Sequence, residues 1–181
     1  MNDMMVENII AYSKIANELD IEEIAEKLPE FNYNPDKFLG LTLKLEKPDV
    51  AVLILKNGKT VFTGSKKRED IENAFVTIMD KIEQIDIKLK KTPTIVIQNI
   101  IASIELKKEL NLDLISKELS SENIEYKPEQ FPGLVYKIDK KGASLLIFNT
   151  GKIVFTGFLS IEEVTDAVEI IKEKLSSVGV L

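Results

Sequence analysis

The sequence predicts an α+β protein built from two pseudo-symmetric repeats, each with four or five antiparallel strands and two helices. The first observation is a duplication. Residues 57–64 read Asn-Gly-Lys-Thr-Val-Phe-Thr-Gly and residues 150–157 read Thr-Gly-Lys-Ile-Val-Phe-Thr-Gly, so six of the eight positions are identical. The second observation is strand patterning with hairpin turns in both copies. The third is a long amphipathic segment that closes each copy.

The duplication extends along most of the chain. Residues 6–11 match residues 97–102 at an offset of 91, and residues 33–41 match residues 126–134 at an offset of 93, so repeat 2 has two extra residues near 120–123. We therefore expect repeat 1 at 6–85, a linker at 86–94 and repeat 2 at 95–178. Two copies of one unit suit a ligand that is itself nearly two-fold, such as duplex DNA.

Repeat 1 reads as a strand, a short helix, three strands and a longer helix. The first strand covers 6–13, and Asp20 caps a short helix that ends before Pro29. Tyr33 begins an irregular segment. The remaining strands, separated by Lys-Pro-Asp and Asn-Gly turns, and the closing helix are Leu41–Glu46, Val50–Leu55, Lys59–Thr63 and Arg68–Ile85.

Repeat 2 follows the same order. Its first strand covers 95–104, Asn111 starts a short helix, and Tyr126 begins an irregular segment. Ser160 and Glu163 form a capping box at the start of the last helix. The remaining elements, with a turn at Lys141-Gly142, are Leu134–Asp139, Ala143–Phe148, Lys152–Thr156 and Ile161–Leu175.

The strands predict a sheet with one face that no helix covers. Residues 51–55 and 145–148 are apolar on both faces, whereas two helices can cover only one face. The other face is either buried against the partner repeat or exposed as a binding surface. Period-two alternation places these side chains on the open face: Asn8, Ile10, Leu53, Leu55, Val61, Thr63, Asn99, Ile101, Leu146, Phe148, Val154 and Thr156.

An apolar face with paired Asn and Thr suits the minor groove of DNA. The Asn amide and Thr hydroxyl can donate to the acceptors that A·T pairs present there, although Asn8 and Asn99 could instead cap local backbone. Bulky tips could enter a base step, or could belong to the core. These tips form two pairs, each separated by 17 positions: Phe38 with Leu55, and Phe131 with Phe148.

Composition and charge exclude several classes of function. The chain has no histidine and no cysteine, which removes the usual zinc ligands and the commonest general base, so we expect no enzyme activity, metal or cofactor. The net charge is −6. Residues 36–68 nevertheless carry +5 and residues 127–159 carry +3, which indicates a basic face, unless this is ordinary charge scatter. No signal peptide or membrane span is predicted, so we expect a soluble intracellular protein.

Several blocks together resemble the TATA-box-binding protein family, in its archaeal branch. They are Tyr-Lys-Pro-Glu-Gln-Phe-Pro-Gly-Leu-Val-Tyr at 126–136, the run from Leu145 to Gly157, Gln-Asn-Ile at 98–100, and their counterparts in repeat 1. The resemblance covers nearly the whole chain. It implies a curved, saddle-like sheet of ten antiparallel strands with four helices on its convex face.

The resemblance and the strand alternation together imply a set of DNA contacts. Phe131 and Phe148 would kink one end of the site and Phe38 the other, with lysines on phosphates. The set is Asn8, Ile10, Phe38, Leu39, Lys44, Leu53, Leu55, Lys59, Val61, Thr63, Asn99, Ile101, Phe131, Pro132, Lys137, Leu146, Phe148, Lys152, Val154 and Thr156. Glu129 and Gln130 would meet a partner, transcription factor B.

Three positions depart from the family pattern. Leu55 replaces a second wedge Phe, Leu39 stands where repeat 2 has Pro132, and Lys127 replaces an acidic residue in the loop that meets factor B. Leucine can still wedge but stacks less well, so the kink of repeat 1 would be weaker.

The expected function is that of a general transcription initiation factor in the cytoplasm of an archaeal cell, associated with the nucleoid. It would bind a TATA box in the minor groove, kink it and recruit factor B and RNA polymerase. The free protein could form a weak homodimer through its apolar face, which the sequence leaves open, and no membrane partner is expected. One alternative is a carrier of a lipid or hydrophobic ligand on the open sheet, and another is an enzyme such as a DNA glycosylase domain.

Overall fold

The structure is a computed structural model that describes residues 4–120, 123–138 and 142–181. Over these residues the chain forms four helices and a ten-stranded antiparallel sheet with strand order β2-β3-β4-β5-β1-β6-β10-β9-β8-β7. The predicted fold class, strand number and helix number are confirmed. The chain divides into a repeat-1 unit, Asn8–Gln98, and a repeat-2 unit, Met1–Glu7 with Asn99–Leu181. The repeat boundaries expected from the sequence stay a prediction.

The repeat-1 unit forms the expected elements and one more strand. The segment at Tyr33, predicted to be irregular, pairs with Leu41 of the next strand. Two residues are too few to carry a periodic signal, so the neighbouring strand decides this pairing. Its elements are β1 (Met5–Lys14, of which the residues up to Glu7 belong to the repeat-2 unit), α1 (Ile21–Lys27), β2 (Asn32–Tyr33), β3 (Gly40–Glu46), β4 (Asp49–Leu55), β5 (Lys59–Ser65) and α2 (Arg68–Glu83).

The repeat-2 unit has the same order of elements, and Tyr126, also predicted to be irregular, lies in a short strand. The strand expected at 134–139 ends at Lys137; Asp139, the turn residue Lys141 and positions 121–122 of the expected insertion lie outside the described residues. Its elements are β6 (Val96–Glu105), α3 (Leu112–Glu118), β7 (Ile124–Tyr126), β8 (Gly133–Lys137), β9 (Ser144–Phe148), β10 (Lys152–Phe158) and α4 (Ile161–Ser177).

The predicted helix caps form. The Asp20 carboxylate accepts from the Glu23 N–H at 3.0 Å, and the Asn111 amide oxygen accepts from the Leu114 N–H at 3.0 Å. The Ser160 hydroxyl accepts from the Glu163 N–H at 3.1 Å. The Glu163 carboxylate reaches back to the N–H of Leu159 instead of Ser160, so the capping box closes one residue earlier than expected.

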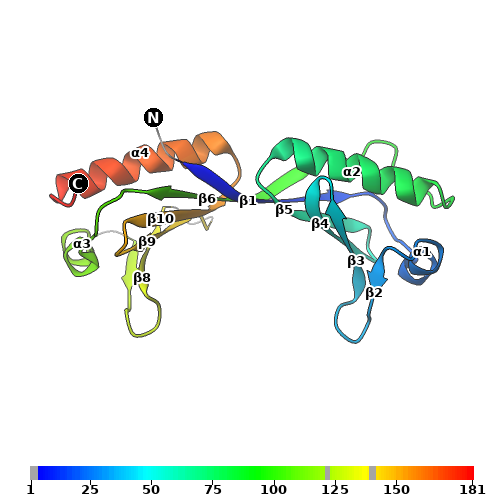
Figure 1. Cartoon of the computed structure of the whole chain (residues 1–181), viewed down its shortest axis with the longest axis horizontal. Coiled ribbons are helices and arrows are strands. Elements are labelled where there is room, and N and C mark those ends of the chain that lie inside the picture. The colour runs from blue at the N-terminus through cyan, green and yellow to red at the C-terminus, as the bar shows by residue number, and fades with distance from the viewer. Residues whose placement is uncertain (1–3, 121–122, 139–141) are drawn as a thin grey trace. The chain divides into compact units, whose positions relative to one another are not determined.

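The helices of each unit cover one face of its strands (Figure 1). In the repeat-1 unit α2 packs on β4 and β5, while α1 packs on β2 and β3; in the repeat-2 unit α4 packs on β10, and α3 on β7 and β8. Fully buried side chains such as Phe62 and Phe155 fill these layers, each contributing roughly 1.5–3 kcal/mol. No helix within the described ranges is long and apolar enough to cross a bilayer.

Candidate nucleic-acid interface

The face that the helices leave uncovered carries the side chains predicted for it. On the helix side, Ile9, Val52, Ile54 and Phe62 are buried in the repeat-1 unit, as are Ile100, Leu145, Ile147 and Phe155 in the repeat-2 unit. Residues that alternate with them are only half-buried, so this face is not packed away against protein. The half-buried set comprises Asn8, Ile10, Leu53, Leu55, Val61, Thr63, Asn99, Ile101, Leu146, Phe148, Val154 and Thr156.

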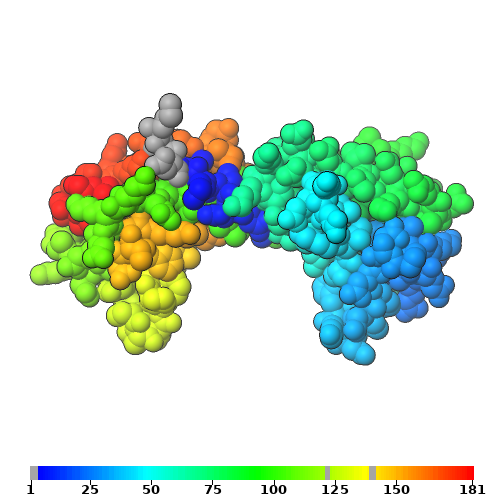
Figure 2. Space-filling model, viewed as in Figure 1, coloured from blue at the N-terminus to red at the C-terminus, as the bar shows by residue number. Residues whose placement is uncertain are grey.

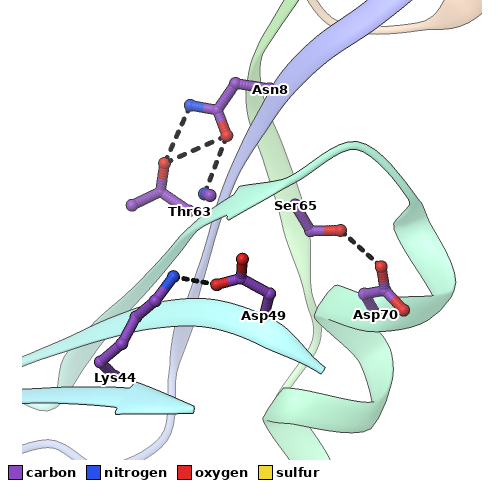
Figure 3. Close-up of polar contacts among 7 residues, drawn as sticks. Asn8, Lys44, Asp49, Thr63, Ser65 and Asp70 are labelled. Carbon is purple, nitrogen blue, oxygen red and sulfur yellow. Dashed lines mark hydrogen bonds and ion pairs between the residues drawn. The ribbon is translucent and has the colours of Figure 1, made fainter. Parts of the chain in front are cut away.

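Asn8 is held by two partners on β5 (Figure 3). Its amide oxygen accepts from the Gly64 N–H at 2.8 Å, and its amide nitrogen donates to the Thr63 hydroxyl at 3.0 Å. A longer contact of 3.4 Å joins the same hydroxyl to the amide oxygen. Because the Gly64 N–H can only donate, the amide oxygen must face it and the nitrogen must face Thr63.

The repeat-2 unit repeats this arrangement. The Asn99 amide oxygen accepts from the Gly157 N–H at 2.7 Å, and its nitrogen donates to the Thr156 hydroxyl at 3.4 Å. Both asparagines thus bind backbone, as the alternative expected, but the backbone of a neighbouring strand and not of their own. Among the described residues each amide uses one of its two N–H groups. The Thr156 hydroxyl only accepts there, whereas the Thr63 hydroxyl donates to the Asn8 amide oxygen over a longer 3.4 Å contact that a ligand could replace.

A β-bulge places each glycine N–H in reach of its asparagine. The pairing of β1 with β5 shifts register between Ile9 and Ala11, and that of β10 with β6 shifts between Phe155 and Phe158. Gly64 has φ 101° and Gly157 has φ 86°, a backbone region that side-chain-bearing residues rarely adopt. The Thr-Gly that ends both octets was the available sequence signal, but Gly64 and Gly157 were not predicted as site residues.

The predicted wedges occur as packed pairs at the strand ends. The Phe131 and Phe148 rings meet edge to face with centroids 5.8 Å apart. A Cβ on Gly133 would come within 2.8 Å of the Phe131 ring, so this pair requires glycine beneath it. Phe131 and Phe148 are half-buried, whereas Pro132, which follows Phe131 in the chain, is exposed.

Repeat 1 builds its wedge in the same way. A Cβ on Gly40 would lie 2.7 Å from the Phe38 ring and 3.2 Å from Leu55. Leu39 is 76% exposed, more than any other large apolar side chain within the described residues. The segment between β2 and β3 projects from the body of its unit, as does the segment between β7 and β8 (Figure 2). Gly40 and Gly133 were not predicted as site residues, although the pattern Phe-x-Gly recurs in both repeats.

Two of the predicted phosphate-contacting lysines occupy equivalent ends of open-face rows. Lys44 pairs across the sheet with Ala51, and Ala51 pairs with Thr63; Lys137 pairs with Ser144, and Ser144 with Thr156. Each lysine has a carboxylate partner. Lys44 forms an ion pair with Asp49 (Figure 3), and Lys137 lies 3.5 Å from Glu125.

Glu125 also lies 3.3 Å from Lys127. A hydrogen bond from Lys127 lowers the pKa of the Glu125 carboxyl below its ordinary value, and Lys137 lowers it further. Part of the positive charge that Lys127 brings to this loop is therefore offset. Glu129 and Gln130 are exposed in the adjoining turn, where the N–H groups of Gln130 and Phe131 donate to the Lys127 carbonyl at 2.9 and 3.0 Å.

The register adds five open-face residues that sequence reasoning missed. Strand alternation alone does not say which residues lie opposite one another, and only the pairing reveals complete rows across the sheet. Within the described parts of the chain, no three His, Cys, Asp or Glu side chains gather as a metal site. The additional residues are Tyr12 opposite Val61, Thr42 opposite Leu53, Ala51 opposite Thr63, Val135 opposite Leu146, and Ser144 opposite Thr156.

Comparison with known families decides the classification. The family profile described as "Transcription factor TFIID (or TATA-binding protein, TBP)" matches residues 3–85 and again residues 94–178. The chain belongs to the TATA-binding protein family. Members of this family from archaea are similar along nearly their whole length. The TATA-box-binding protein of Haloarcula marismortui is 42% identical over 97% of this chain and 95% of its own. That of Picrophilus torridus is 40% identical over 100% and 98%.

A solved TATA-binding protein has the same fold. The structure of Methanococcus jannaschii TBP matches with a TM-score of 0.83 at 38% sequence identity, covering 96% of this chain and 98% of that one. The family resemblance drawn from the sequence motifs is thereby confirmed, as are the antiparallel sheet and four helices that it implied.

Proposed function

We propose that this protein is a general transcription initiation factor that binds a TATA-like promoter element through the open sheet face. The observation that carries the proposal is the pair of donor groups fixed on an apolar face: Asn8 with Thr63, and Asn99 with Thr156. Family membership supports it, because the relatives are named for the TATA box. It also favours a DNA-binding role over a hydrophobic-ligand carrier or an enzyme.

The donors match what A·T pairs present in the minor groove. There A·T and T·A pairs show only acceptors, adenine N3 and thymine O2, whereas G·C pairs add the guanine N2 amino donor. An amide oxygen bonded to the Gly64 or Gly157 N–H has used one of its two lone pairs, which reduces its capacity to accept from that amino group. The surrounding Ile10, Val61 and Val154 would contact the sugar walls.

The wedge pairs would kink the DNA. Apolar side chains that enter a base step unstack it and bend the duplex toward the major groove, and TA steps deform most easily. Phe131 and Phe148 would act at one end, and Phe38 with Leu55 at the other. Leu39 and Pro132 are exposed beside them and would contact the same steps.

Lysines would bind the DNA backbone, and the turn that carries Glu129 and Gln130 would bind factor B. Lys44, Lys59, Lys137 and Lys152 would contact phosphates, so binding should weaken steeply with salt. Glu129 and Gln130 are exposed next to a hollow lined by Tyr126, Pro128 and Pro132, where factor B would dock and so bring RNA polymerase.

Energy transfer between dyes at the two duplex ends tests the proposal. We expect tight binding and a large bend on a TATA duplex, with weak binding and no bend on a G·C duplex of equal length. A duplex with inosine in place of guanine lacks the N2 amino group in the minor groove, so it should regain much of the binding. An unbent TATA complex, or equal binding to all three duplexes, would overturn the proposal.

A matched pair of variants separates the wedge from general apolar surface. Phe148→Ala should reduce the bend and weaken TATA binding on the order of tenfold, as the loss of about 1.4 kcal/mol would. Leu159→Ala removes a side chain that is 54% exposed between β10 and α4, outside the proposed contact set. This control should bind and bend TATA DNA like the unmodified protein.

A further inference from the structure

We propose that repeat 1 carries a two-lysine phosphate site, formed by Lys14 and Lys59 beside Tyr12, that repeat 2 lacks. Lys14 and Tyr12 lie outside the contact set predicted from the sequence. The inference rests on the proposed function, because the phosphate would come from the DNA backbone next to the open face.

The geometry brings two ammonium groups to one place. Lys14 lies directly opposite Lys59 across β1 and β5, and Tyr12 lies opposite Val61 one row further in. The intervening Ser13 and Thr60 are fully buried on the helix side, so both lysine side chains emerge on the open side. The Lys59 ammonium rests over the Tyr12 ring, 4.7 Å from its centroid.

Nothing in the described residues neutralises this pair. Directly opposed residues have Cβ atoms roughly 4.5–5.5 Å apart, and like charges there are destabilising. Lys44 and Lys137 each have a carboxylate within ion-pair distance, but neither Lys14 nor Lys59 has one among the described residues. A phosphate placed between the two ammonium groups would remove their repulsion and accept charge-assisted hydrogen bonds from both.

Repeat 2 provides an internal comparison at the same register. There Lys152 lies opposite Glu105, and Ser103 lies opposite Val154. Glu105 would repel a phosphate that Lys152 attracts. Ser103 stands where repeat 1 has Tyr12, and its buried hydroxyl donates to the Glu7 carboxylate at 2.7 Å. Within the described residues no aromatic ring lies under the Lys152 ammonium. The two repeats therefore differ by two charges at one position of an otherwise shared surface.

Salt-titrated binding to a TATA duplex tests the site through charge. Lys14→Gln should lower the slope of log affinity against log salt by about one and weaken binding several-fold at low salt. Glu105→Lys should build the missing site in repeat 2 and raise the slope by about one. Lys117→Gln removes an exposed lysine on α3, within the helix layer, and should leave the slope unchanged.

Three results separate the explanations. The two-lysine site alone would be overturned if the unmodified protein binds and bends TATA DNA and Lys14→Gln has the same salt slope. Failure of the unmodified protein to bind would overturn the proposed function with it. Thermal melting guards against misfolding, because Lys14→Gln relieves a like-charge pair and should melt no lower than the unmodified protein; a lower melting temperature counts against the unneutralised pair.

Discussion

Asn8 and Asn99 show how a single side chain acquires a defined chemical direction. An asparagine amide can present either a donor or an acceptor, and the choice depends on its partners. Here a glycine N–H at 2.8 or 2.7 Å occupies the oxygen, so the nitrogen is turned toward threonine and the open face. The same residue on an unbulged strand would be free to present its oxygen instead.

Asn8→Asp should therefore impair DNA binding strongly, although aspartate has nearly the same shape as asparagine. The carboxylate can still accept from the Gly64 N–H, but it would present an acceptor and a negative charge to base acceptors. We expect TATA affinity to fall about 10- to 100-fold, corresponding to an unmet polar group at about 1–3 kcal/mol. Filter binding would measure it. Asn73→Asp adds the same charge to an exposed position on α2. A comparable loss of TATA affinity in this variant would contradict the proposed donor role of Asn8.

A second residue-scale feature lies on the helix side of the same strands. The hydroxyls of Ser13 and Thr60 are buried opposite each other without a hydrogen-bond partner in the described residues. The equivalent positions in repeat 2 hold Ile104 and Ile153, both buried. This part of the core therefore accepts apolar side chains. Burying the two hydroxyls costs free energy that no hydrogen bond compensates.

Thr60→Val should raise the free energy of unfolding by about 1 kcal/mol, because valine has nearly the same shape without the unmet hydroxyl. Urea denaturation followed by circular dichroism would measure the change. Thr77→Val, at a half-buried position on α2 where the hydroxyl donates to the Asn73 carbonyl at 2.9 Å, should not stabilise the protein. A destabilised Thr60→Val would show that the hydroxyl has a partner after all.

At the scale of elements, the two hairpin ends differ in strength. Each consists of a strand end and a turn packed over a glycine, yet repeat 1 has Leu55 where repeat 2 has Phe148. An aromatic ring stacks on a base more effectively than leucine. The proposed kink at the Leu55 end should be the shallower one.

Leu55→Phe should deepen that kink, because Gly40 leaves the same space under the pair that Gly133 leaves in repeat 2. We expect a larger end-to-end bend and a gain in binding free energy of about 0.5–1.5 kcal/mol. Energy transfer on TATA duplexes would report it. The reciprocal Phe148→Leu should reduce the bend. Identical bends with the unmodified protein and both variants would show that positions 55 and 148 do not act as wedges.

Local sequence patterns predicted the helix caps but not the two shortest strands. Asp20, Asn111 and Ser160 were assigned as caps from local sequence, and each makes its bond, because capping involves residues three apart. The short strands β2 and β7 were not predicted. Their two or three residues form strands only because β3 and β8 offer them backbone partners.

At the scale of the whole molecule, each unit leaves one face of its strands uncovered by helices, and half-buried apolar side chains lie on that face. Such surfaces tend to associate with one another. We expect the free protein to self-associate weakly, with a sedimentation coefficient that rises with concentration and falls to that of a one-to-one complex when TATA duplex is added.

Two substitutions on opposite faces check this expectation. Leu53→Glu puts a charge on the open face and should suppress self-association. Val76→Glu puts the same charge on α2, at a side chain that is 55% exposed, and should leave self-association intact. Sedimentation velocity distinguishes the two, and equal suppression by both would place the contact elsewhere.

The sequence by itself determined the duplication, the element order, the caps and the parity of each strand, since these depend on neighbours a few residues apart. It also placed Asn8, Thr63, Asn99 and Thr156 on one face. Only the tertiary structure decided what these residues do to one another: the bulges at Gly64 and Gly157 that orient the amides, the glycines beneath the wedges, and the meeting of Lys14 with Lys59. The amide and lysine contacts join residues about 45–60 positions apart, and the glycines meet side chains across a neighbouring strand. Their geometry depends on strand register, which period-two alternation leaves open.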